Sequence, residues 1–292
     1  MCDFSQTETH WIMNEFGVGT RSTASEFFEV QVADAVERVP TWFMENRAVG
    51  QPSASAFTLI ELLVILAVIA LLAAFLVPAL SGGKRAASRI KCVANLRELG
   101  VAGQMYWDDN AGAAFRWRGA STNAGQIYWF GWLADGSEGR RNFDPTFGAL
   151  HPYLGGRGVE ICPAFDYVSS HLKLKATGAS YGYGYNLGLS PPPDEPPKNV
   201  HRIARATELV FLADAAQVNT FQSPASPEHP MLEEFYYLST REPTVHFRHS
   251  RAVNAVFCDG HVASERPAPE SLDRRLRHQI IGRLRSEILV VE

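Results

Sequence analysis

The sequence predicts an α+β protein in which a long N-terminal hydrophobic helix packs on a small, mainly antiparallel β-sheet head. Three observations support this fold class. An apolar run over residues 57–80 is followed by an amphipathic stretch over residues 81–109. Residues 110–266 then alternate short β-prone runs with Gly, Pro and Asn turns. A hairpin pattern closes this head region near residue 260.

The apolar run from Phe57 to Leu80 predicts a transmembrane helix. At about 1.5 Å of rise per residue, its length matches the roughly 30 Å hydrocarbon core of a bilayer. A buried core helix of a soluble protein is the alternative, but residues 62–80 contain no polar side chain that could face water. The run carries a single charge, Glu61, and a carboxylate in such a segment usually has a partner or a function.

Composition narrows the classes of protein. The net charge of -4 argues against a nucleic-acid-binding protein, which normally has a basic face. The chain has four cysteines and no CxxC pair, so the sequence predicts no zinc-ribbon or thioredoxin-like site. In an exported head, Cys162 and Cys258 could form a disulfide, and buried free thiols are an equally good interpretation.

Residues 84–107 have apolar side chains at roughly helical spacing, which predicts that the membrane helix continues as an amphipathic stalk. The predicted buried face includes Ile90, Leu96, Leu99, Val101 and Met105. The turn-forming sequence over residues 109–112, Asp-Asn-Ala-Gly, is expected to end this helix.

Several short runs in the head predict strands. Residues 127–133 form an aromatic run typical of a strand or an aromatic-lined loop, and residues 159–163 are expected to end a strand. Residues 180–190 alternate Tyr and Gly, which suits a strand that another backbone approaches closely. Residues 208–214 predict a buried strand that ends at Asp214.

The C-terminal pattern predicts a hairpin in which residues 252–258 form a strand and Asp259-Gly260 forms the turn. On the structural interpretation, Asp259 and Gly260 are present because the backbone of the turn favours these residue types. The alternative is a metal or acid–base site made by His249, Asp259 and His261, with His246 or Asp214 as further members. Two imidazoles and a carboxylate suit zinc, whereas calcium prefers more oxygen ligands.

No Ser, Cys or His residue has the sequence context of a nucleophile, and no Gly-rich loop has the context of a phosphate site. We therefore expect a protein that is not an enzyme and has no cofactor other than a divalent metal such as calcium or zinc. The tail over residues 267–292 has apolar residues at near-helical spacing, which predicts a C-terminal helix.

From Ala56 to Leu80 the sequence AFTLIELLVILAVIALLAAFLVPAL resembles the N-terminal segment of type IV prepilins and type II secretion pseudopilins. In that family a prepilin peptidase cuts a leader off before a Phe and methylates the new amine. The resemblance implies processing between Ala56 and Phe57, and pairing of Glu61 with the N-terminus of a neighbouring subunit. Pro78 stands where many pilins have a helix-kinking proline. Ala56 replaces the commoner Gly, and the leader lacks the usual basic cluster.

Residues 1–56 are then a leader, or an N-terminal extension from an over-called start. Met44 is an alternative start that gives a leader of thirteen residues, which suits the family better. His249 is separated from Asp259-Gly260 by nine residues. This spacing resembles the H-X9-DG signature of one branch of prepilin-like proteins, a branch without a settled biochemical activity.

The resemblance implies a structural subunit of a pilus or pseudopilus linked to type II secretion. Its partners would be the prepilin peptidase/methyltransferase, other pilin-like subunits, the assembly machinery and the membrane. It implies a single-pass inner-membrane protein with the head in the periplasm or outside the cell. The basic residues after the run, including Lys84 and Arg85, would by the positive-inside rule alone place the head in the cytoplasm. The alternative function is a membrane-anchored periplasmic protein that binds a ligand or depends on a metal.

Overall fold

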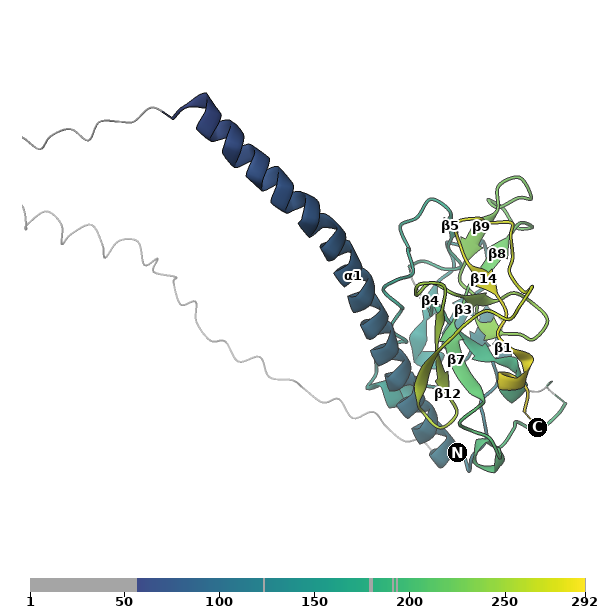
Figure 1. Ribbon diagram of the computed structural model, residues 1–292. Helices are drawn as coiled ribbons and strands as arrows, with labels where there is room; N and C mark the ends of the chain where they lie inside the picture. The colour runs from purple at the N-terminus through teal and green to yellow at the C-terminus, as the bar shows by residue number, and fades with distance from the viewer. Residues whose placement is uncertain (1–56, 123, 179–180, 191, 193, 292) are drawn as a thin grey trace, which may run out of the picture. The chain divides into compact units, whose positions relative to one another are not determined.

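The computed structural model describes residues 57–122, 124–178, 181–190, 192 and 194–291. One long helix, α1, precedes a set of mostly short strands (Figure 1). One long N-terminal helix followed by mainly antiparallel sheets confirms the predicted α+β class. The helix and strands are α1 Leu59–Asp109, β1 Arg118–Thr122, β2 Gly125–Tyr128, β3 Gly131–Ala134, β4 Phe143–Asp144, β5 Leu172–Lys173, β6 Tyr183–Asn186, β7 Val210–Asp214, β8 Gln217–Asn219, β9 Met231–Glu233, β10 Tyr237–Leu238, β11 Val245–His246, β12 Val253–Phe257, β13 Val262–Glu265 and β14 Ile281–Gly282. Short 3-10 turns cover Pro145–Phe147, His151–Leu154, Leu187–Leu189, Val200–Arg202 and Ser286–Ile288.

The central sheet has the strand order β10-β6-β7-β12-β13. All its pairs are antiparallel except β10 with β6. The pair between β7 and β12 places Ala213 opposite Ala255 and Leu212 opposite Val256. Every residue of β7 and β12 is buried, which is the expectation for strands covered on both faces. Smaller sheets have the orders β1-β2-β3-β4, β5-β9-β8 and β11-β14.

Helix α1 runs without a break from Leu59 through Pro78 to Asp109. Its end is built as the sequence predicts: the Gly112 N–H donates to the Trp107 carbonyl, and Gly112 has φ of 84°. Among the described residues, α1 is the one helix long and apolar enough to cross a membrane, and its most apolar window is entirely exposed. These properties are compatible with a single-pass anchor.

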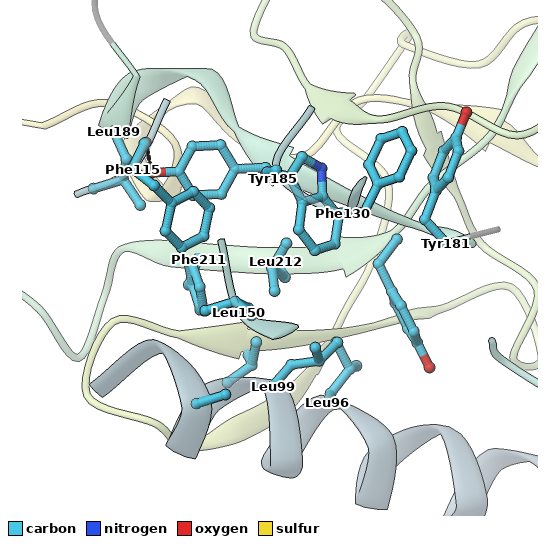
Figure 2. Packing of buried hydrophobic residues seen from close by; sticks show 14 of the residues in the cluster. Leu96, Leu99, Phe115, Phe130, Leu150, Tyr181, Tyr185, Leu189, Phe211 and Leu212 are labelled. Carbon is cyan, nitrogen blue, oxygen red and sulfur yellow. Dashed lines mark hydrogen bonds between the residues drawn. The ribbon is translucent and has the colours of Figure 1, made fainter. Parts of the chain in front are cut away.

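The C-terminal part of α1 packs on the face of the sheet that carries Phe211 and Val256. Figure 2 shows Leu96 and Leu99 directed from α1 toward Leu212 of β7. The predicted buried face of the helix is partly wrong. Leu96 and Leu99 are buried, but the residues that complete the contact are Cys92, Ala102 and Trp107, whereas Ile90, Val101 and Met105 are exposed. The true contact face is thus rotated relative to the predicted one.

The opposite face of the sheet is covered by the C-terminal tail. Leu284, Ile288 and Leu289 pack with residues of β7 and β12 in a second buried cluster. The predicted C-terminal helix is wrong for the described residues, because the tail instead contains β14 and the 3-10 turn Ser286–Ile288. Strand β14 pairs with β11, placing Ile281 opposite His246. Tertiary pairing and burial override the helical spacing of the apolar residues here.

Three predicted strands are present, as β6, β7 and β12, and the aromatic run over residues 127–133 forms parts of the hairpin β2–β3. At Gly184 of β6, an added Cβ would lie 2.9 Å from the backbone carbonyl carbon of Tyr237, so the close backbone approach predicted for the Tyr-Gly segment is confirmed. The strand end predicted over residues 159–163 is wrong, because the structure has no strand there. This part of the chain is an irregular segment that passes beside α1 at Cys162.

Candidate metal-binding site

Four potential metal ligands converge in the core between α1 and the central sheet. They are Cys92 of α1, Cys162 of the irregular segment, Asp214 at the end of β7 and His249 just before β12. One ligand atom from each residue lies within 4.8 Å of the other three, and all four residues are buried. We call this set the CCDH group. Segments far apart in the sequence therefore supply a compact set of two sulfurs, one oxygen and one nitrogen.

The contacts inside the CCDH group are close. The Cys92 Sγ lies 3.4 Å from the Asp214 Oδ1, and the Cys162 Sγ lies 3.4 Å from the His249 Nε2. The same Nε2 lies 3.2 Å from the Asp214 Oδ2. The backbone N–H of Asn254 also donates to Oδ2 at 3.2 Å, which orients the carboxylate. The four donor atoms therefore face one another.

His249 is held by a tight two-residue turn. Its N–H donates to the Ala252 carbonyl at 3.0 Å, and the Ala252 N–H donates back at 3.1 Å. The two central residues, Ser250 and Arg251, have φ of 55° and 65°. Turns of this kind favour Asn and Gly, and left-handed backbone at other residues costs on the order of 1–3 kcal/mol. The surrounding fold thus holds His249 against Asp214 in spite of an unfavourable backbone.

Arg248 lies beside the CCDH group and is itself buried. Its Nη2 donates to the carbonyls of Gly182 and Ala215 at 3.0 and 3.1 Å, and its Nε is 3.6 Å from the Asp214 Oδ1. The guanidinium also lies over the Phe165 ring at 4.5 Å. A buried positive charge next to the four ligands favours a net negative charge on them.

The electrostatics of the group follow from these contacts. Burial alone would raise the pKa of Asp214, but the Arg248 charge and the His249 hydrogen bond outweigh it and lower this pKa. Burial opposes protonation of His249, but hydrogen bonds to Asp214 and Cys162 raise its pKa to about 9. The hydrogen bond from Cys92 lowers the pKa of the Cys162 thiol to about 6, and the same bond, with burial, raises the pKa of Cys92.

The geometry does not match a catalytic triad. In a triad, the nucleophile and the carboxylate bond to opposite nitrogens of the imidazole. Here the Cys162 sulfur and the Asp214 carboxylate both approach His249 Nε2. The CCDH group could instead hold a metal ion.

The structure brings together only part of the predicted site. His249 and Asp214 belong to the CCDH group, but Asp259 and His261 do not. The Asp259 Oδ1 accepts from the backbone N–H of His261 at 3.1 Å and lies 2.6 Å from the ring Nδ1. The predicted His249–Asp259–His261 set is therefore corrected, because strand β12 separates His249 from the turn at its other end.

The Asp259-Gly260 turn connects β12 to β13, as the structural interpretation predicted. The Phe257 N–H donates to the His261 carbonyl at 2.9 Å, so the loop consists of Cys258, Asp259 and Gly260, one residue more than predicted. Gly260 has φ of 89°, which favours glycine. His246 is also outside the CCDH group, and its Nε2 lies 2.9 Å from the Gln279 Oε1.

The cysteines of the CCDH group were missed by the sequence reasoning. Cys92 and Cys162 are separated by 69 residues and fit no short spacing motif. The one available signal was that Cys92 lies in a predicted amphipathic helix four residues before Leu96, a residue of the predicted buried face. Of the two interpretations for Cys162 and Cys258, the structure has free, buried thiols. Burial raises the pKa of Cys258, which is not a member of the CCDH group.

The start of α1 contains a second local feature that the sequence reasoning missed. The Thr58 N–H donates to the Glu61 Oε2 at 2.9 Å, and the Glu61 N–H donates to the Thr58 Oγ1 at 3.3 Å. This reciprocal pair is a capping box, readable from the pattern Thr-x-x-Glu. Phe57 is exposed, whereas Ala56, the leader and the alternative start Met44 lie outside the described residues.

Comparison of the chain with known protein families, with curated proteins and with solved structures found no match.

Proposed function

We propose that the protein is a pilin-like structural subunit of a pseudopilus linked to type II secretion. It is inserted in the inner membrane through α1, with the head in the periplasm or outside the cell. A prepilin peptidase/methyltransferase cuts after Ala56 and methylates Phe57. The processed subunit then leaves the bilayer and joins other pilin-like subunits through α1, guided by the assembly machinery.

The observation that carries this proposal is the exposed apolar part of α1 with one acidic residue in its first turn. Side chains such as Leu59, Phe75 and Leu80 are about 70% exposed or more. Burying apolar surface contributes about 25 cal/mol per Å², so such a helix requires a non-aqueous environment. Lipid supplies it before assembly, and neighbouring helices supply it in a fibre.

The same exposed surface extends past the membrane segment. Ile90, Val101 and Met105 lie on α1 away from the sheet and are 70%, 61% and 47% exposed. In a fibre these side chains would contact neighbouring subunits. This supports an assembly role for the whole helix.

In the fibre, Glu61 would pair with the N-terminal amine of a neighbouring subunit. Mutation can separate this role from the role of Glu61 at the start of its own helix. In this structure its carboxylate caps its own helix through Thr58. Glutamine also serves at this position of a capping box, so Glu61→Gln keeps the cap while it removes the charge. Thr58→Ala is the matched control, because it removes half of the cap and leaves the charge.

The test measures membrane insertion and fibre yield for both variants in cells that express the assembly machinery. We expect Glu61→Gln to insert normally and to lose most of its fibre yield, and Thr58→Ala to assemble. Mass spectrometry of the mature wild-type protein should find a methylated N-terminus at Phe57. Wild-type fibre amounts from Glu61→Gln, or a mature N-terminus upstream of Phe57, would refute the proposal.

A second candidate is a membrane-anchored periplasmic protein whose head binds a ligand or depends on a divalent metal. The CCDH group favours it. The group supplies four protein ligands, whereas a catalytic zinc site keeps one position open for water or substrate. The metal of this candidate would therefore support the structure of the head and would not take part in a reaction. A specific small-molecule ligand of the detergent-solubilised chain whose binding is lost in His249→Ala would favour this candidate over the structural subunit.

A further inference from the structure

We propose that Cys92, Cys162, Asp214 and His249 bind a structural Zn²⁺ ion that joins helix α1 to the head. The inference is independent of fibre assembly, because every ligand lies within the compact unit formed by residues 63–292.

The donor set fits zinc. Two thiolates, an imidazole and a carboxylate are common zinc ligands, whereas calcium and magnesium take oxygen. For zinc–sulfur bonds of about 2.3 Å and zinc–nitrogen or zinc–oxygen bonds of about 2.0 Å, the edges of a tetrahedron are roughly 3.3–3.8 Å. The closest contacts in the CCDH group are 3.2–3.4 Å, and the widest is at most 4.8 Å. Small side-chain movements would complete the tetrahedron.

The local charges also fit the ion. Two thiolates and the Asp214 carboxylate carry three negative charges, and Zn²⁺ supplies two positive ones. Arg248, whose Nε lies 3.6 Å from Asp214, balances the remaining negative charge. The site is then neutral in a buried environment, where an unbalanced charge would be costly.

A groove reaches one of the four ligands, His249. This groove of about 930 Å³ lies between α1 and the segments at residues 163–164 and 248–250. His249 and Arg248 line it on the side of the head, and Lys84, Arg85 and Arg89 line it on the side of α1. The groove therefore brings solvent to His249, at the edge of the CCDH group.

The position of the site suggests what the ion does. Cys92 is the first buried residue of α1 among those whose burial is described, so it marks where the helix first meets the head. The other three ligands come from the irregular segment, β7 and the turn before β12. Zn²⁺ would cross-link these four segments, and a site closed by four protein ligands contributes directly to folding.

The experiment uses the full-length chain purified in detergent without chelators, in a Cys2→Ser background that leaves only the three described cysteines. Metal content per chain is measured for wild type, Cys92→Ser, Cys162→Ser and His249→Gln. Cys258→Ser is the matched control, because it removes a buried thiol outside the CCDH group. Replacement of zinc by Co²⁺ reports thiolate ligation through its charge-transfer absorption.

We expect about one zinc per chain in wild type and in Cys258→Ser, and less than about a tenth of that in the three site variants. The Co²⁺ charge-transfer band should weaken in Cys92→Ser and Cys162→Ser and persist in Cys258→Ser. Removing the metal with a strong chelator should lower the melting temperature by about 10 °C or more.

Three results would overturn the proposal. The first is wild-type protein that contains no zinc and gives no thiolate absorption with Co²⁺. The second is purified protein in which Cys92 and Cys162 form a disulfide. The third is equal loss of zinc in Cys258→Ser and Cys92→Ser, because that would show a general effect of core thiols on folding.

Discussion

The contact between α1 and the central sheet depends on glycines, and Gly103 gives the sharpest test. A Cβ added at Gly103 would lie 2.6 Å from the Phe211 Cε1 and 3.0 Å from its Cζ. The Phe211 ring is fully buried and is surrounded by the rings of Trp107, Phe115 and Tyr185. Since the ring has no free space to move into, Gly103→Ala should overpack the core.

The size of the effect follows from two opposing terms. Replacing Gly by Ala inside a helix contributes about 1 kcal/mol of stability through helix propensity. Overpacking a well-packed core costs about 1–3 kcal/mol. The expected net change for Gly103→Ala is a loss of about 0–2 kcal/mol, and Gly103→Val should lose more because it adds two further methyl groups and is a poorer helix former.

Gly83→Ala is the matched control in the same helix, because no atom lies within 4 Å of its added Cβ. Thermal unfolding in detergent can be followed by Trp fluorescence, since the Trp107 and Phe211 ring centroids are 4.8 Å apart. At about 2–4 °C per kcal/mol for a domain of this size, Gly103→Ala should melt up to about 8 °C lower than wild type, and Gly103→Val lower still. Gly83→Ala should not melt below wild type. A Gly103→Val protein as stable as wild type would refute this account of the packing.

Two further predictions concern buried polar groups. Glu233 pairs with Lys173 at 2.8 Å and Lys175 at 3.0 Å; burial would raise its pKa, but the two lysines lower it below 4.5. Glu233→Gln should therefore lower the free energy of unfolding by about 3 kcal/mol. In wild type, this stabilisation should be lost as the pH falls below about 4.5, because Glu233 becomes protonated. Thermal melts of the variant should lack this part of the acid sensitivity. The Tyr185 hydroxyl donates to the Phe115 carbonyl at 2.8 Å, whereas the buried Tyr181 hydroxyl has no hydrogen-bond partner among the residues that the structure describes. Tyr185→Phe should lose about 1 kcal/mol in denaturant titrations and Tyr181→Phe nothing, and equal effects of the two would contradict the assignment of the bond.

Much of the fold was predictable because local patterns and tertiary demands agree there. Strand β7 is an apolar run of strand length, and β12 is followed by a Gly that can adopt positive φ in the turn. The end of α1 has its turn signal at Gly112. In such segments, hydrophobic periodicity and turn-forming residues are sufficient to predict the conformation.

The tail was mispredicted because its conformation is decided elsewhere. Its apolar residues have helical spacing, but β7 and β12 expose a second apolar face that needs a cover. Leu284, Ile288 and Leu289 cover this face. Ile281 instead lies in an extended pair with β11 and packs in a separate buried cluster. A pattern within one segment cannot show that a distant sheet has two faces to bury.

The candidate site was half predictable for the same reason. Asp214 ends one predicted strand and His249 precedes another, so both were open to inference as candidates, but the pairing of β7 with β12 that brings them together was not. Asp259 and His261 were grouped with His249 because they are near it in sequence, yet β12 runs between them. Cys92 and Cys162 could be added only by knowing which face of α1 meets the sheet.

The position of the CCDH group links the two proposals physically. Under the proposed function, α1 is held among neighbouring helices and the head is held only through its contact with α1. Any force on the head then reaches the helix first at Cys92, where burial on α1 begins. Apolar packing there is non-directional, but metal–ligand bonds from four segments resist separation in every direction. If zinc binds at this junction, its removal should loosen the head from α1 before the sheet itself unfolds, so hydrogen exchange of the chelated protein should rise first near residues 88–99 and 161–163, with β7 and β12 still protected.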